Sequence, residues 1–236
     1  MKSKTYILLV SALIMILAFP NRVYAKDSFF DKRIHKAYIS GYPDGTIRPE
    51  RYVTREEAAS MFYRLLDDDT EKDKKTFNDV DENRWSYEAI GTLGVLGIIN
   101  GEEGFFRPED RITRAEMAVI ISKFADLDKG WHTFNDVKGH WAENAISSAV
   151  SYGWMAGYTD GEFRPNGHIT RAEMTFFINN ALGRGTDKTD NMHAEMKVWK
   201  DNTDTDKWYY FAMQEASNSH EYIISENTDE VWKAIV

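Results

Sequence analysis

The sequence predicts a mainly α-helical fold of three similar units, each made of a helix, a turn, a short extended piece and a second helix. Two repeated segments lead to this prediction. The first, here called the Thr-Arg segment, runs from a glycine through Arg-Pro to Thr-Arg-x-Glu and occurs at residues 41–57, 101–116 and 157–173. The second, the Trp segment, runs from Phe-x-Asp-Val to a tryptophan and alternates with the first. A repeat of about 58 residues indicates stacked units that share one core.

Both segments end in a helical pattern of apolar residues. After Trp85, the residues Ala89, Ile90 and Leu93 recur at helical spacing, and Gly97 is a suitable end for this helix. The stretch after each Thr-Arg pair has the same period. Asp-Gly dipeptides between the helices predict turns. The Arg-Pro pairs predict extended backbone, because a residue before proline avoids the helical region.

Each Thr-Arg segment contains the spacing of a helix capping box. The pairs are Thr54–Glu57, Thr113–Glu116 and Thr170–Glu173. In this motif the threonine hydroxyl accepts a hydrogen bond from the backbone three residues on, and the glutamate accepts one from the threonine N–H. We therefore assign structural roles to the threonine and the glutamate.

An arginine follows each capping threonine, at the first position of the helix. These residues are Arg55, Arg114 and Arg171. A positive charge at a helix N-terminus is unfavourable, so helix stability does not explain the recurrence. One interpretation is a structural salt bridge to Asp79, Asp136 or Asp201 of a neighbouring unit. The other is an anion site made by the guanidinium and the free N–H groups of the helix start, in which case Arg171→Ala should hardly change the thermal midpoint.

Three tryptophans stand at the same place in successive Trp segments, and they are Trp85, Trp141 and Trp208. Tryptophan is usually largely buried, so we expect core anchors at the helix starts. The alternative is the wall of a pocket, in which the indole stacks on a sugar ring.

The composition excludes several classes of function. A formal net charge of −9 repels nucleic acid and anionic membranes at long range. The chain has no cysteine, which excludes disulfides, thiolate metal sites and cysteine nucleophiles. Its six histidines show neither metal-binding spacing nor a shared repeat position. The copies share no pair of acidic residues outside the capping box, so we expect no catalytic site, no metal and no cofactor.

The chain divides into five expected regions. They are a signal peptide at 1–25, a first repeat with a truncated first half at 26–76, a second repeat at 77–133, a third repeat at 134–185, and a linker with a degenerate C-terminal half-repeat at 186–236. Lys2 and Lys4 precede a short apolar run, as in a secretory signal peptide. An uncleaved membrane anchor is the alternative; after cleavage we expect no membrane association.

The C-terminal half-repeat has two interpretations. It contains a Trp segment at 199–213 with no Thr-Arg segment after it, whereas the first repeat has only a stub of the Trp segment. It can pack beside that stub and complete a ring of three units. Alternatively, it is a capping helix over an exposed apolar end.

The two segments together resemble the S-layer homology domain. The pattern is nearly complete in residues 134–174, good in 77–117 and half present in 38–57. The resemblance implies a pseudo-threefold arrangement of the units around a central helix bundle. It also implies non-covalent attachment to the secondary polysaccharide of a Gram-positive-type cell wall, often through a pyruvate ketal. The ketal carboxylate is the anion that the three arginines would accept, beside loops shaped by Gly41, Gly101 and Gly157.

We therefore expect an exported, non-enzymatic module that binds a pyruvylated cell-wall polysaccharide at the cell surface. Members of this family often carry an enzyme or a lattice-forming region, and we expect this chain to stand alone without one. The alternative is a structural surface-layer protein that binds other protein subunits or peptidoglycan. The third copy is the most complete, whereas the second has a shorter loop at Gly101–Gly104 without the Asp-Gly turn. The sequence therefore favours the third copy as the first place to look for a ligand.

Overall fold

The computed structural model describes residues 34–66, 73–125, 130–225 and 229–236, and the predicted signal peptide lies outside them. The described chain is mainly helical, as predicted. Three helices begin directly after the capping threonines, and they are α2 (Arg55–Tyr63), α4 (Arg114–Phe124) and α6 (Arg171–Leu182). Three others follow the tryptophans of the Trp segments, and they are α3 (Tyr87–Val95), α5 (Glu143–Ser151) and α7 (Tyr210–Ser217).

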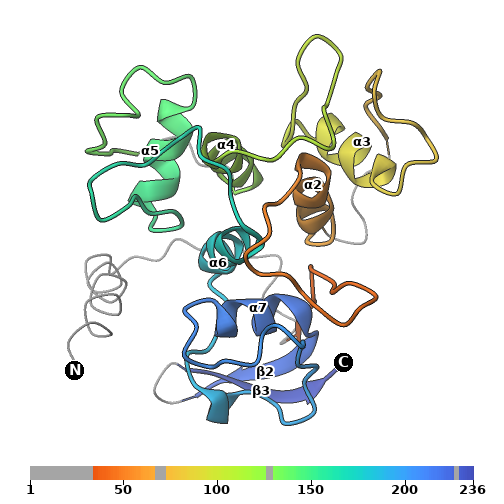
Figure 1. Ribbon diagram of the computed structural model, residues 1–236, viewed down its shortest axis with the longest axis vertical. Helices are drawn as coiled ribbons and strands as arrows, with labels where there is room; N and C mark the ends of the chain where they lie inside the picture. Colours follow the sequence, from red (N-terminus) through yellow and green to blue (C-terminus); the bar gives the residue numbers. More distant parts are fainter. Residues whose placement is uncertain (1–33, 67–72, 126–129, 226–228) are drawn as a thin grey trace.

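The helices form a three-lobed molecule (Figure 1). The helices α2, α4 and α6 lie together in the centre, and α3, α5 and α7 lie outside them. Each central helix packs on one outer helix, in the pairs α2 with α3, α4 with α5 and α6 with α7. This is the pseudo-threefold arrangement that the family resemblance implies.

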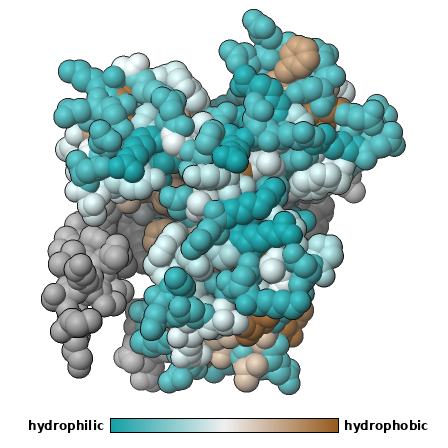
Figure 2. Space-filling view, viewed as in Figure 1, coloured by the Kyte–Doolittle hydropathy of each residue, from teal (hydrophilic) through white to brown (hydrophobic). Residues whose placement is uncertain are grey.

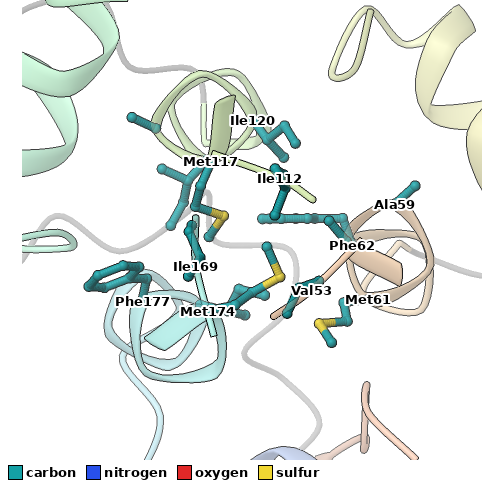
Figure 3. Packing of buried hydrophobic residues seen from close by; sticks show 14 of the residues in the cluster. Val53, Ala59, Met61, Phe62, Ile112, Met117, Ile120, Ile169, Met174 and Phe177 are labelled. Atoms are coloured by element: carbon teal, nitrogen blue, oxygen red, sulfur yellow. The ribbon is translucent and has the colours of Figure 1, made fainter. Parts of the chain in front are cut away.

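The centre of the bundle is apolar and is closed by backbone hydrogen bonds. Phe62, Met117 and Met174, one from each central helix, lie at its middle (Figure 3). Three extended residues that precede these helices are linked in a cycle. The N–H of Val53 donates to Ile169 (3.0 Å), that of Ile169 to Ile112 (3.3 Å) and that of Ile112 to Val53 (3.0 Å). The three units therefore meet in a closed ring.

The capping boxes begin all three central helices, as predicted. At α2, the Thr54 side chain accepts from the N–H of Glu57, and the Glu57 carboxylate accepts from the N–H of Thr54. The same reciprocal pair starts α4 and α6. Gly97 and Gly153 follow the ends of α3 and α5 with φ of 70° and 71°, the left-handed conformation in which glycine ends helices.

The prediction of extended backbone at the Arg-Pro pairs is wrong. Arg48, Arg107 and Arg164 have φ of 52°, 57° and 58°, in the left-handed region. The resulting sharp turn directs the carbonyl of the following proline at the central helix of the preceding unit in the ring. The Pro108 carbonyl, for example, accepts from the N–H of Glu56 at 3.0 Å. This interunit hydrogen bond, made in each copy, offsets the strain of about 1–3 kcal/mol that such a residue carries.

The C-terminal segment completes the first unit, so the structure has the closed ring rather than a simple cap. The N–H groups of Tyr38 and Ile39 both donate to the carbonyl of Ala216 at the end of α7. Beside α7, a three-stranded antiparallel sheet has the order β1 (Ile34–His35), β2 (His220–Ile224) and β3 (Glu230–Ile235). The sheet thus pairs residues from both ends of the described chain. A short 3-10 helix, η2 (Thr189–Asn191), lies in the linker.

Candidate ligand-binding grooves

Each arginine of a Thr-Arg pair fastens its unit to the loop of the next unit. Arg55 donates from Nε to the carbonyl of Phe106 (2.8 Å) and from Nη2 to that of Asn100 (3.0 Å). Arg114 and Arg171 repeat both bonds on the next loops. Their acceptors are the carbonyls of Phe163 (2.7 Å) and Ala156 (2.5 Å), and of Ile47 (2.9 Å) and Ser40 (3.1 Å). Because Arg171 holds the first loop, these contacts run round the whole ring.

The predicted salt bridges from these arginines to the aspartates of the Trp segments are absent from the described residues. Each aspartate instead accepts two backbone N–H groups of the loop. Asp79, for example, accepts from Phe106 at 2.7 Å and from Arg107 at 2.6 Å. The equivalent pairs involve Asp136 with Phe163 and Arg164, and Asp201 with Ile47 and Arg48. The loop is therefore held on one side by an arginine and on the other by an aspartate.

The N–H groups at the helix starts are occupied, which corrects the expectation that they are free for an anion. At α2, the N–H of Arg55 donates to Asp110 (2.8 Å) and that of Glu56 to Pro108 (3.0 Å). The N–H of Glu57 donates to its capping threonine. The starts of α4 and α6 are satisfied in the same way by the neighbouring unit. Recognition of an anion therefore depends on side chains.

The loop glycines are required by close packing. A Cβ atom on Gly41 would lie 1.9 Å from the ring of Trp199, and one on Gly157 would lie 2.2 Å from that of Phe134. At Gly101 it would lie 2.3 Å from the carbonyl oxygen of Phe105. The glycines let the start of the Trp segment approach the loop beside the arginine.

The prediction that Trp85, Trp141 and Trp208 are core anchors is wrong. Their exposed fractions are 61%, 68% and 58%. The core position of the Trp segment is taken by the aromatic residue at its start, such as Phe77, which is 7% exposed. The three indoles instead stand on the surface, beside the outer helices.

Three of the predicted residues meet in one groove of about 490 Å³. Arg55 comes from the first unit, Gly101 from the second and Trp141 from the start of the third. Thr113, Glu116 and Asn166 add polar groups, and the rest of the lining is largely apolar. The groove thus combines a guanidinium, an exposed indole and hydrogen-bonding side chains.

The groove is open beside Arg55 because the shortened loop lacks a tyrosine. In the other two copies Tyr42 and Tyr158 follow the loop glycine, and their ring centroids lie 5.3 and 4.9 Å from the Cζ atoms of Arg171 and Arg114. Glu102 takes this place in the second copy. Arg55 is accordingly 9% exposed, against 2% for Arg114 and 4% for Arg171. The accessibility of the arginine therefore favours the groove beside Arg55 over the third copy that the sequence favoured.

The three guanidinium groups also differ in charge compensation. Arg55 forms an ion pair with Glu116, the capping glutamate of the next helix. Within the described residues, Arg114 and Arg171 make no ion pair. Burial lowers the pKa of both guanidinium groups, because desolvation disfavours the charged form. These two arginines are buried cations held by carbonyls and aromatic rings.

Comparison with known proteins agrees with this architecture. Residues 34–59, 76–118 and 133–175 match the family model of the S-layer homology domain. The chain belongs to this family. It is 33% identical over 218 residues to Cell surface glycoprotein 1 of Acetivibrio thermocellus, a match that covers 85% of this chain and 9% of the relative.

Two further relatives also match this chain. The Cellulosome-anchoring protein of Acetivibrio thermocellus is 34% identical over 209 residues, which covers 84% of this chain and 45% of the relative. An S-layer protein of Bacillus licheniformis is 32% identical over 162 residues, which covers 66% of this chain and 18% of the relative. The chain thus spans less than half the length of each of these three relatives.

The S-layer homology family assigns the chain to the cell surface of a Gram-positive-type bacterium, as a non-enzymatic anchoring module. Among the described residues, no helix combines the length and apolar character needed to cross a membrane. The space-filling view shows a mainly hydrophilic face (Figure 2).

Proposed function

We propose that the groove beside Arg55 binds an anionic, pyruvylated sugar of the secondary cell-wall polysaccharide, and that this contact anchors the protein. The observation that carries the proposal is the meeting of Arg55, Gly101 and Trp141 in one open groove. An exposed indole offers a flat face for a sugar ring, because aromatic faces carry apolar area and a negative quadrupole. A guanidinium offers paired donors that match a carboxylate.

Glu116 already pairs with the guanidinium that an anionic ligand would contact. It holds the guanidinium of Arg55 through Oε1, while its Oε2 accepts from the capping Thr113. A ligand carboxylate competes with Glu116 for the same donor, so affinity depends on the indole and the apolar lining as well. Arg107, whose side chain is half exposed, adds a second positive charge at the rim of the groove.

The equivalent residues of the other copies form two further candidate sites. They are Arg114 with Gly157 and Trp208, and Arg171 with Gly41 and Trp85. Tyr158 and Tyr42 lie over these two buried arginines, so we expect a ligand to reach them only when the tyrosine moves aside. We therefore assign the main contribution to the open groove.

The test is binding of the full chain to purified wall sacculi after Trp141→Ala. This indole is 68% exposed, so its removal should leave stability nearly unchanged. We expect about a tenfold loss in affinity, which corresponds to about 1.4 kcal/mol. Trp131→Ala is the matched control, because Trp131 is 62% exposed and lies outside the groove. Equal losses in the two variants, or no loss in either, would contradict the proposal.

Trp85→Ala then measures how much the site beside Arg171, whose guanidinium lies under Tyr42, contributes to wall binding. Trp85 occupies the same repeat position as Trp141 and is 61% exposed, but it does not line the open groove. We expect less than a twofold loss. A larger loss than for Trp141→Ala would move the main site to the copy covered by Tyr42.

The alternative partner is a surface-layer protein or the peptidoglycan itself. The similarity to an S-layer protein of Bacillus licheniformis is the reason to test this alternative. Sacculi that have been stripped of secondary polymer by acid distinguish the two. Loss of binding supports polymer recognition, whereas undiminished binding supports peptidoglycan, and binding that requires added surface-layer protein supports the protein partner.

A further inference from the structure

Four buried side chains from four different elements meet below α7, beside the small sheet. They are His35 of β1, Glu215 of α7, His220 of β2 and Glu230 of β3. One ligand atom of each lies within 4.8 Å of those of the other three. All four residues are at least 93% buried, and Glu215 and His220 are fully so. Figure 1 shows the elements α7, β2 and β3 stacked in this lobe. The wall-binding groove uses none of these residues.

The contacts between the imidazole nitrogens and the carboxylate oxygens are close to the ligand separations around a small tetrahedral ion. His35 Nδ1 lies 2.9 Å from Glu215 Oε1 and 3.4 Å from Glu230 Oε1. His220 Nε2 lies 3.1 Å from Glu230 Oε1 and 3.5 Å from Glu215 Oε2. A tetrahedral zinc ion with bonds of about 2.0–2.1 Å holds its ligands about 3.3–3.4 Å apart. These four separations, which involve both oxygens of Glu215, lie on both sides of that value, and one ligand atom from each residue lies within 4.8 Å of the others.

The hydrogen bonds around His220 direct a lone pair into the cluster. His220 Nδ1 lies 2.9 Å from the carbonyl oxygen of Asn218, which can only accept, so Nδ1 carries a proton. In the neutral ring, Nε2 then presents its lone pair to oxygens of Glu230 and Glu215. Glu215 Oε2 is buried and has no hydrogen-bond donor. Lone pairs that face one another in a buried site call for a cation between them.

Outer contacts hold the acidic ligand in place. Glu230 Oε1 accepts from Trp232 Nε1 at 3.1 Å, and Glu230 Oε2 accepts from the N–H of Gly185 at 3.1 Å. The Trp232 ring also stacks on His220, with centroids 3.7 Å apart and planes inclined by 16°. Such second-layer hydrogen bonds orient the ligands of a metal ion and raise its affinity.

We propose that His35, Glu215, His220 and Glu230 bind one divalent first-row transition-metal ion, with zinc as the best fit. Two carboxylates balance the charge of the ion, and two neutral imidazoles complete the set. Mixed imidazole and carboxylate ligation in a four-coordinate site is typical of zinc, whereas calcium and magnesium prefer six or more oxygen ligands. The ion links β1, which precedes the first unit, to α7, β2 and β3, which follow the third. It therefore fastens the closure of the ring.

The sequence gives little sign of this site, because His35 and His220 are 185 residues apart and lie outside the repeat pattern. The expectation of no metal rested on the absence of cysteine, on the local spacing of the histidines and on the lack of an acidic pair shared by the copies. Only the pairing of β1 with β2, which sets His35 opposite His220, brings them together.

The first test is metal binding by the full chain after treatment with a strong chelator. Zinc is titrated at neutral pH in competition with a chromophoric chelator, and bound metal is measured by elemental analysis. We expect one ion per chain and a thermal midpoint that rises until one equivalent is reached. Cobalt should give the visible absorption of a tetrahedral site. Absence of stoichiometric zinc, or an unchanged midpoint, would overturn the proposal and leave a buried network of imidazolium–carboxylate pairs.

Variants separate ligation from nonspecific binding to histidine. His220→Gln should abolish stoichiometric zinc binding, whereas His193→Gln, outside the cluster, should retain it. Trp232→Phe keeps the ring stack but removes the hydrogen bond to Glu230, so we expect about a tenfold loss in zinc affinity. If His220→Gln does not fold, Trp232→Phe and the wild-type titration still decide the matter. Unchanged zinc affinity in Trp232→Phe would overturn the assigned geometry.

Discussion

At the scale of single residues, the arginine of the Thr-Arg pair is a bridge between units. Helix stability does not explain this arginine, as expected from the sequence, and its partners in the structure are backbone carbonyls of the next loop. Those carbonyls carry no side-chain signature, so the sequence could not name them. Because Arg171 makes the equivalent bonds, we now expect its removal to lower the thermal midpoint as well.

Arg114→Ala should destabilise the fold strongly. It removes two charge-assisted hydrogen bonds and leaves the buried carbonyls of Phe163 and Ala156 without these donors. We expect a loss of about 3 kcal/mol in the free energy of unfolding, measured by urea denaturation. Arg164→Ala is the control, since its side chain is half exposed and its ion pair with Asp160 lies at the surface. That variant should lose less than about 1 kcal/mol. Equal losses would show that Arg114 is not a bridge.

The three tryptophans of the Trp segments show that residue type alone does not predict burial. The usual burial of tryptophan predicts a core position, yet Trp85, Trp141 and Trp208 are exposed, whereas the aromatic residues at the starts of these segments, such as Phe77 and Trp199, are buried. The Trp segment contains two aromatic positions, and composition does not say which one points inward. The exposed indoles are therefore available to contact a ligand.

At the scale of elements, the helices and their starts follow closely from the sequence. Capping boxes and apolar periods act within a few residues, so local patterns are enough to predict them. The Arg-Pro turns were missed because their left-handed backbone is stabilised by bonds to other units, such as that from the N–H of Glu56 to Pro108. The recurrence of Tyr42 and Tyr158 after the loop glycine, with Glu102 in the second copy, is a signal that sequence reasoning could have used.

Glu102→Tyr should close the open groove. A tyrosine at this position would cover Arg55 as Tyr158 covers Arg114. We expect at least a fivefold loss in affinity for wall sacculi, with the urea midpoint nearly unchanged because Glu102 is exposed. Glu102→Gln, which removes the same charge without adding a ring, should bind like the wild type. If both variants lose affinity equally, charge rather than access governs the groove.

At the scale of the whole molecule, the two ends of the chain build one lobe together. Asp201, near the C-terminus, accepts the N–H groups of Ile47 and Arg48 at 2.8 Å each. The sequence allowed this closure as one of two arrangements, because the N-terminal stub and the C-terminal Trp segment are complementary fragments of one unit. Only long-range contacts could decide between them.

Asp201→Ala should destabilise the protein about as much as Asp136→Ala. Both aspartates hold two backbone N–H groups of a loop, one across the chain ends and the other within the chain. We expect a loss of about 2 kcal/mol for each, again from urea denaturation. A negligible loss for Asp201→Ala alone would mean that the C-terminal segment is a loosely attached cap.

The central claim is that the open groove recognises an anionic wall sugar. A crystal structure of the full chain with a pyruvylated amino sugar tests it most directly. We expect the sugar ring to lie against Trp141 and its carboxylate to contact the guanidinium of Arg55. A sugar seated only beside Arg114 or Arg171, or one whose carboxylate faces away from all three arginines, would contradict it.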